Sequence, residues 1–141
     1  MSLSIGELAR RTGSKVQTIR YYETIGLLAP AGRTAGNQRR YDRATADRLA
    51  FIRHGRALGF TLDEIRSLLA LSDRPELSCE AADAIARRRL EDVERRIGQL
   101  ESLKSELSRM IEQCRGGTVA DCRIIEVVAD HALCLDEDHA G

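Results

Sequence analysis

Four cysteines carry the most distinctive chemistry of this 141-residue chain: Cys79, Cys114, Cys122 and Cys134. Cys114 and Cys122 flank a loop with two glycines, which can fold back so that both thiolates reach one metal ion. Two thiolates alone suit a linear site of the Cu(I) type. With Cys79 the count favours a soft divalent ion, because three thiolates with M²⁺ leave a charge of −1, whereas M⁺ leaves a costlier −2 in a buried site.

The number of ligands leaves the identity of the soft divalent ion open. Zinc requires a fourth ligand for tetrahedral geometry, whereas Pb(II) and Hg(II) accept three sulfurs. His131 and Cys134 are possible extra ligands. A thiol-redox sensor is an alternative in which Cys114 and Cys122 pair as a disulfide, but it gives Cys79 no role.

A long helix is predicted between Cys79 and Cys114, over residues ~80–112. At 1.5 Å per residue it holds these thiols roughly 50 Å apart, so they cannot share an ion within one chain. Its apolar stripe is close to a heptad seam, which predicts a dimerisation coiled coil in a homodimer. In an antiparallel pair, the start of one helix lies beside the end of the other, so that Cys79 of one subunit joins Cys114 and Cys122 of its partner. The stripe consists of Ala86, Leu90, Val93, Ile97, Leu100, Leu103, Leu107 and Met110.

The two halves of the chain carry opposite charges, although Lys+Arg and Asp+Glu are balanced at 22 each. Residues 1–70 hold 12 basic and 6 acidic side chains, and residues 71–141 hold 10 basic and 16 acidic ones. Twenty of the basic residues are arginines, whose planar guanidinium matches phosphates and guanine edges. This asymmetry predicts a nucleic-acid-binding half and a separate regulatory half.

Capping signals in the basic half predict a helix-turn-helix. Ser4 with Glu7 and Ser14 with Gln17 form two Ser-x-x-Glu/Gln boxes, separated by a stop at Gly13. The second helix has an apolar face and a polar face, as expected of a helix that reads the major groove. The arginine-rich turn residues 30–43 that follow predict a wing.

Two more helices are expected after the wing, one from about Thr45 to Leu58 and one opened by the capping box of Thr61 with Glu64. Tyr41, at the end of the wing, suits either packing beneath it or contact with a phosphate. The candidate contacts to double-stranded DNA are Lys15, Gln17, Thr18, Arg20, Tyr21 and Tyr41. In the wing, Arg33 and Arg39, with Arg40 as a weaker candidate, either contact the DNA as well or only make the loop soluble.

These segments resemble the MerR family of bacterial transcription regulators. IGELARRTGSKVQTIRYYETIGLL followed by GRTAGNQRRY is similar to the family's DNA-binding segment, and RLAFIRHGRALGFTLDEIRSLL to its second helical pair. Cysteines on both sides of a long helix resemble the heavy-metal-sensing branch. One departure lies in the wing, where Gln38 replaces the usual aromatic residue.

The resemblance implies a homodimer bound at a promoter whose −35 and −10 elements are too far apart. Metal binding then distorts the DNA so that RNA polymerase can use it. The loop between Cys114 and Cys122, with DCRIIE after it, resembles the Cu(I)/Ag(I)/Au(I) sensors, which carry Ser where this chain has Cys79. The third thiolate is characteristic of the Zn(II)/Cd(II)/Pb(II)/Hg(II) branch, and we follow the cysteine count.

The sequence thus predicts an all-α protein with a small β wing: a winged helix-turn-helix domain with a second helical pair (residues 1–72), a dimerisation helix (73–113) and a metal-binding loop, short helix and tail (114–141). An enzyme is not expected, because the histidines have no catalytic spacing and no Gly-rich phosphate loop occurs. No apolar run approaches the ~20 residues of a membrane span, and the N-terminus lacks a signal peptide's apolar core, so a cytoplasmic location is expected.

Overall fold

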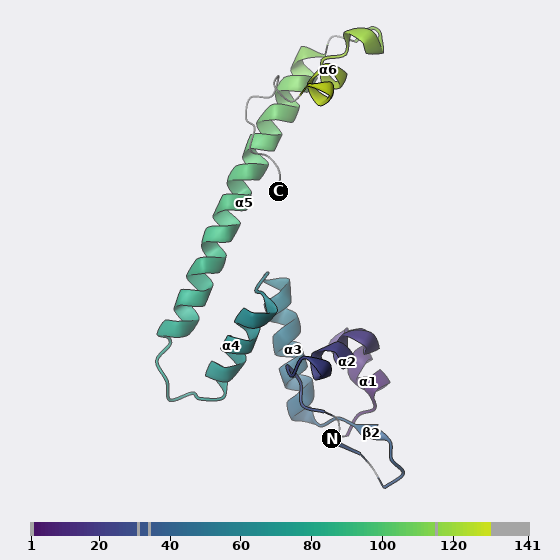
Figure 1. Cartoon of the computed structure of the whole chain (residues 1–141), viewed down its shortest axis with the longest axis vertical. Helices are drawn as coiled ribbons and strands as arrows, with labels where there is room; N and C mark the ends of the chain where they lie inside the picture. Colours follow the sequence, from purple (N-terminus) through teal and green to yellow (C-terminus); the bar gives the residue numbers. More distant parts are fainter. Residues whose placement is uncertain (1, 31, 34, 115, 131–141) are drawn as a thin grey trace. The chain divides into compact units, whose positions relative to one another are not determined.

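The computed structural model describes residues 2–30, 32–33, 35–114 and 116–130. Within them the chain is mostly helical with one two-stranded sheet, as the sequence predicts (Figure 1). The elements in order are α1 (Ile5–Thr12), α2 (Val16–Thr24), β1 (Gly32–Arg33), β2 (Arg39–Arg40), α3 (Arg43–Ala57), α4 (Leu62–Ser72), α5 (Glu80–Gln113), the 3₁₀ turn η1 (Val119–Asp121) and α6 (Arg123–Ala129). Contacts divide the chain into two compact units, Met1–Ile85 and Ala86–Gly141.

The helix-turn-helix forms much as its capping signals predict. The Ser4 hydroxyl caps α1 by accepting the N–H of Glu7 at 3.2 Å, and Gly13 ends this helix with the left-handed φ of 67° that glycine adopts freely. The cap predicted at Ser14 is wrong by one residue. The N-cap of α2 is Lys15, which makes no side-chain cap, and the Ser14 hydroxyl instead accepts a bond from the Thr12 hydroxyl at 3.1 Å.

The second helical pair begins at two side-chain caps. Asp42 caps α3 by accepting the N–H of Thr45 at 2.9 Å, so this helix starts at Arg43, two residues before the predicted start. Thr61 and Glu64 form the predicted capping box of α4, in which each side chain accepts the other residue's backbone N–H. Both helices are therefore fixed at their N-termini by local sequence.

One apolar core holds the first unit together and positions the wing. Ile19 of α2, Leu49 and Ile52 of α3, and Ile65 of α4 are all fully buried in it. The wing strands β1 and β2 are antiparallel, with Gly32 opposite Arg40 and Arg33 opposite Arg39. Paired backbone hydrogen bonds of 2.8 Å between Leu3 and Tyr41 tie the base of the wing to the N-terminal segment.

The second unit contains most of α5, the cysteine loop and α6. α5 is continuous over 34 residues, in agreement with the predicted long helix. Its apolar stripe is largely uncovered in the single chain, where Leu90, Ile97, Leu100 and Leu107 each expose about half of their surface. Met110 and Val127 of this unit are buried, at 6% and 3% exposure. Among the described residues, no helix is both long enough and apolar enough to cross a membrane.

Candidate thiol centre and nucleic-acid interface

The thiols of Cys114 and Cys122 lie beside each other. Cys114 directly follows α5, and Cys122 is the N-cap of α6. The pKa of Cys122 is lowered from its ordinary value, chiefly by a hydrogen bond from the backbone N–H of Ile125. Burial opposes this shift, whereas the Ile124 N–H and the Cys114 side chain lower the pKa further. The second cysteine of the pair is thus held where its thiolate, the form that binds metal, is favoured.

A glycine turn and the start of α6 produce this arrangement. Gly116 and Gly117 both have positive φ, at 75° and 92°, which lets the chain reverse direction after α5. The 3₁₀ turn η1 then leads to Cys122. Because both thiols are only half-buried, an ion from solvent can reach them. The loop thus brings the thiols of Cys114 and Cys122 close together, as the sequence predicts.

Cys79 is exposed and belongs to the other unit. It comes just before α5, and its carbonyl accepts the N–H of Asp83 at 2.9 Å. Its side chain borders a hollow of about 290 Å³ that is lined in part by Phe51 and Leu77. In the part of the chain that the structure describes, no three Cys, His, Asp or Glu side chains gather as a metal site. The candidate extra ligands His131 and Cys134 lie outside the described residues.

The predicted DNA-reading face of α2 is open to solvent. Gln17, Arg20 and Tyr21 are exposed and Thr18 is half-buried, while Ile19 is fully buried in the core. Lys15, just before the helix, is also exposed. This face therefore presents amide, guanidinium, hydroxyl and phenol groups together, all of which bond phosphates or base edges.

The wing places two of its arginines differently. Arg33 is exposed, and its guanidinium donates to the carbonyl of Asn37 at 3.2 Å, across the turn. Arg40 instead turns back and donates to the backbone carbonyl and hydroxyl of Ser2, at 3.0 and 2.9 Å. Arg39 lies in β2, and its side chain is outside what the structure describes.

Tyr41 is a correction to the predicted DNA contacts. Its side chain is 2% exposed and belongs to the core, and its hydroxyl donates to the Glu23 carboxylate of α2. Of the two roles that the sequence left open, packing beneath the wing is therefore correct. Tyr41 links the wing to the helix beside it instead of reaching a phosphate, a role that its amphipathic ring allows.

Two comparisons with known proteins identify the family. Residues 3–72 match the family described as "MerR HTH family regulatory protein", and residues 46–110 match "MerR, DNA binding". The mercuric resistance operon regulatory protein of Bacillus cereus is 39% identical over 129 residues, which cover 91% of this chain and 98% of that protein. The chain belongs to the MerR family.

Solved MerR-family structures show the same fold. The transcription regulator PbrR691 from Ralstonia metallidurans CH34, crystallised in complex with lead(II), is 40% identical, covers 89% of this chain and 98% of that chain, and gives a TM-score of 0.76. MerR from Bacillus megaterium MB1, in complex with mercury(II), is 34% identical, covers 91% of this chain and all of that chain, and gives a TM-score of 0.69. Members of the family are transcription regulators and not enzymes.

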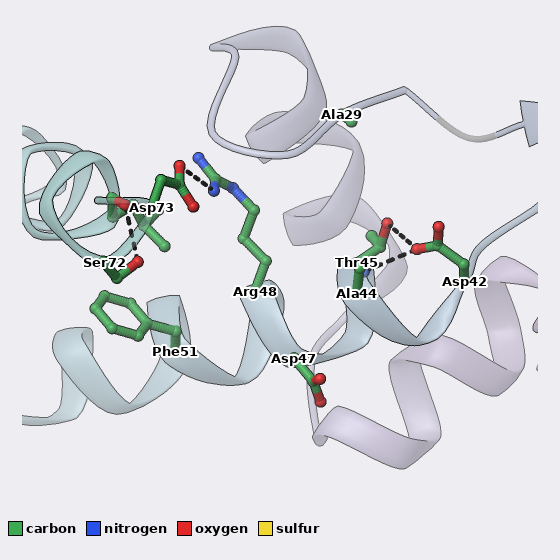
Figure 2. A pocket seen from close by; sticks show the side chains of 10 residues that line it. Ala29, Asp42, Ala44, Thr45, Asp47, Arg48, Phe51, Ser72 and Asp73 are labelled. Carbon is green, nitrogen blue, oxygen red and sulfur yellow. Dashed lines mark hydrogen bonds and ion pairs between the residues drawn. The ribbon is translucent and has the colours of Figure 1, made fainter. Parts of the chain in front are cut away.

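Some arginines of this MerR-family chain stabilise the fold, a role that the number of arginines in the basic half did not indicate. Nε of Arg48 donates to the Leu27 carbonyl at 2.8 Å, and the Arg66 guanidinium donates to the Ile25 carbonyl at 2.8 Å. Both bonds tie α3 or α4 to the chain that follows α2. Arg48 is also ion-paired with Asp73 at 3.6 Å (Figure 2), and both residues line a hollow of about 530 Å³. The side chains of Arg48 and Arg66 are therefore engaged in the fold and are not candidate DNA contacts.

Proposed function

We propose that the chain binds promoter DNA as a homodimer and activates metal-resistance or efflux genes when a soft divalent metal ion occupies its thiols. The observation that carries this proposal is the juxtaposition of Cys114 and Cys122 in a MerR-family chain. Two adjacent thiols, one of them with a lowered pKa, supply two of the three sulfurs of the proposed thiolate site. The relatives crystallised with lead(II) and mercury(II) support an ion of this class.

The donor set suits three-coordinate binding across a dimer. One chain supplies Cys114 and Cys122, and Cys79 of the partner subunit supplies the third sulfur. This arrangement agrees with the lack of a three-ligand group in the described part of one chain. It also agrees with α5, because a helix of 34 residues is about 50 Å long. The bound ion would link the two subunits, so its arrival can change the dimer's shape.

The exposed stripe of α5 supports the homodimer. Large apolar side chains repeat along a helix that a single chain leaves uncovered, with Leu100 58% exposed and Leu107 54% exposed. A second α5 running in the opposite direction covers the stripe and brings the start of one helix beside the end of the other. That direction is the one that a shared thiolate site requires.

The basic unit supplies the DNA contacts in this proposal. Gln17 and Arg20 of α2 face the major groove, with Lys15, Thr18 and Tyr21 beside them. The wing residues Arg33 and Arg39 bind the flanking backbone or the minor groove. At the promoter the dimer acts on RNA polymerase through the shape of the DNA, as the family resemblance implies.

Thiol oxidation is a second candidate function that one observation favours. Adjacent Cys114 and Cys122 can form a disulfide, and the lowered pKa of Cys122 favours the attacking thiolate. A Cu(I)-type ion is a further alternative, because two sulfurs suffice for a linear site. Neither candidate uses Cys79.

One experiment separates these functions: transcription in vitro from the chain's own promoter under reducing conditions, with a panel of Zn(II), Cd(II), Pb(II), Hg(II) and Cu(I). The proposal expects activation by one or more of the divalent ions, and loss of that activation in Cys79→Ser. Activation by Cu(I) alone would overturn the divalent assignment. Activation by an oxidant without metal would favour the redox function.

A further inference from the structure

A pair of side chains closes the loop between the two cysteines. Gln113 directly precedes Cys114, and Arg123 directly follows Cys122. Nε of Arg123 donates to Oε1 of Gln113 at 2.7 Å. Because each partner is the sequence neighbour of one cysteine, this hydrogen bond joins the two ends of the loop that the thiols flank. We call the pair Gln113–Arg123 the loop clasp.

The Gln113 end of the loop clasp is fastened to α5. The same Oε1 atom accepts a second, longer bond of 3.4 Å from the Arg109 guanidinium, since a carbonyl oxygen has two lone pairs. Arg109 in turn is ion-paired with Glu106 at 2.5 Å, and the Glu106 side chain is only 5% exposed. The clasp is therefore held by a buried ion pair on the last turns of the helix.

The Arg123 end is fastened to α6. A second nitrogen of the Arg123 guanidinium pairs with the Glu126 carboxylate at 3.0 Å, within the first turn of the helix. That turn also supplies the backbone N–H groups that face Cys122. Val127 of the same helix is buried in this unit, at 3% exposure. The clasp thus connects two packed helices.

We propose that Gln113 and Arg123 are positioning residues, which hold Cys114 and Cys122 together before any ion arrives. A loop with two glycines has many open conformations, and closing it costs conformational entropy. The clasp restricts those conformations, so less of this cost falls on metal binding. The metal-binding part of this inference rests on the proposed function, whereas the positioning of the thiols does not.

Thiol–disulfide exchange measures the positioning without metal. In full-length Cys79→Ser/Cys134→Ser protein, one glutathione disulfide oxidises Cys114 and Cys122 to an intramolecular disulfide and leaves two reduced glutathiones. Gln113→Ala should lower this equilibrium constant about fivefold, the effect of losing one net hydrogen bond. Gln113→Glu keeps the acceptor and should stay near the parent value. Glu112→Ala, one residue earlier and exposed, is the matched control.

A double-mutant cycle tests whether the two residues act together. Gln113→Ala combined with Arg123→Ala should lower the constant by less than the sum of the two single losses, because both changes remove the same bond. Additive losses, or an effect of Gln113→Ala equal to that of Glu112→Ala, would overturn the clasp. Far-ultraviolet circular dichroism verifies that each variant is folded. If Arg123→Ala fails to fold, the contrast between Gln113→Ala and Gln113→Glu still decides.

A titration with Pb(II) then connects the clasp to metal binding. In the wild-type chain, the absorption of charge transfer from thiolate to lead should appear on binding. Gln113→Ala should weaken the apparent affinity by about the same factor as the disulfide equilibrium, with the band position unchanged because the same sulfurs bind. Equal affinities would overturn the effect of the clasp on metal binding. A wild-type chain without the band would contradict the metal function alone, since the glutathione measurement still decides the clasp.

Discussion

The guanidinium of Arg20 is exposed on α2, next in sequence to the fully buried Ile19. If Arg20 binds a phosphate, its binding releases one counterion from the DNA, and Arg20→Ala abolishes that release. DNA binding should then weaken, and the slope of log K against log salt should fall by about one, while metal affinity is unchanged. Gel shifts at several salt concentrations measure both quantities.

Lys104→Ala is the matched control for Arg20→Ala. It also removes one positive charge, but from an exposed position on α5 outside the proposed DNA-binding surface. A smaller effect of Lys104→Ala would show that position matters beyond total charge. Unchanged affinity and slope in Arg20→Ala would remove that residue from the interface.

The cap of α3 makes stability depend on pH. The pKa of Asp42 is lowered, first by the backbone N–H of Thr45 and then by the Thr45 hydroxyl. A carboxylate whose folded pKa is below its unfolded value stabilises the fold above the unfolded value, and this contribution is lost as pH falls through the folded pKa. Asp42→Asn keeps an acceptor but no charge, so it should lower the melting temperature at pH 7.

The difference between wild type and Asp42→Asn should shrink as the pH falls through the lowered pKa of Asp42, because the Asp42 carboxylate itself then becomes neutral. Thermal unfolding followed by circular dichroism at fixed protein concentration measures it. An equal difference at every pH would show that the charge of Asp42 contributes nothing. No such pH dependence follows from Thr61, whose capping hydroxyl does not titrate in this range.

Residue types predicted the exposed and buried faces of α2, but they did not decide the role of Tyr41. A tyrosine at the end of a wing is equally suited to core and phosphate by its chemistry. The decision lies with Glu23, which is 18 residues away and accepts the phenol hydrogen bond. A contact between residues so far apart requires knowledge of how α2 and the wing pack.

Sequence patterns predicted the start of a helix best where all the capping contacts lie within one short segment. The box of Thr61 and Glu64 needs only a four-residue turn, and it forms as the sequence predicts. The equivalent pattern at Ser14 is wrong by one residue, because the neighbouring Thr12 hydroxyl donates to the Ser14 hydroxyl. Short connections such as this one bring two elements close enough for their side chains to compete.

The packing of α3 against α4 depends on a glycine. A Cβ at Gly55 would lie 2.9 Å from Cγ1 of Ile65, which is fully buried. Gly55→Ala should therefore force the two helices apart and lower the free energy of unfolding by about 1–3 kcal/mol. Gly98 is the matched control in α5, because no atom lies within 4 Å of the added Cβ.

Gly98→Ala should raise the free energy of unfolding by about 0.5–1 kcal/mol, since alanine is the better helix former. Urea denaturation of both variants at one protein concentration measures the two effects. If both substitutions stabilise, α3 and α4 do not approach as closely as the contact at Gly55 implies. The heptad-like pattern predicted α5, but not this contact between α3 and α4.

For the molecule as a whole, the sequence predicted a dimer because α5 has more apolar surface than one chain covers. The exposure of Leu90, Ile97 and Leu100 agrees with that argument. The thiol centre was predicted only in part. The glycines indicated that Cys114 and Cys122 would meet, whereas the loop clasp was missed, because hydrogen bonding between two long side chains depends on how α6 lies against α5.

The cross-subunit metal site is testable by complementation. A Cys79→Ser homodimer and a Cys114→Ser homodimer should each lack a tight site for Pb(II), because every site has lost one sulfur. A heterodimer of the two chains, purified with two different affinity tags, distributes the lesions unequally. One site receives both substitutions. The other receives an intact Cys79 from one chain and an intact Cys114 and Cys122 from its partner.

The heterodimer should therefore bind one Pb(II) ion with near-wild-type affinity, measured by the charge-transfer band at known heterodimer concentration. If each site were built within one chain, both sites of the heterodimer would carry one lesion, and no tight binding would return. Recovery of one site thus requires both the antiparallel α5 pairing and ligands from two subunits. A Cys114→Ser chain paired with a Cys122→Ser chain is the matched control. Each chain supplies Cys114 and Cys122 together to one site, so both sites of this heterodimer lack one sulfur and no intact site can form.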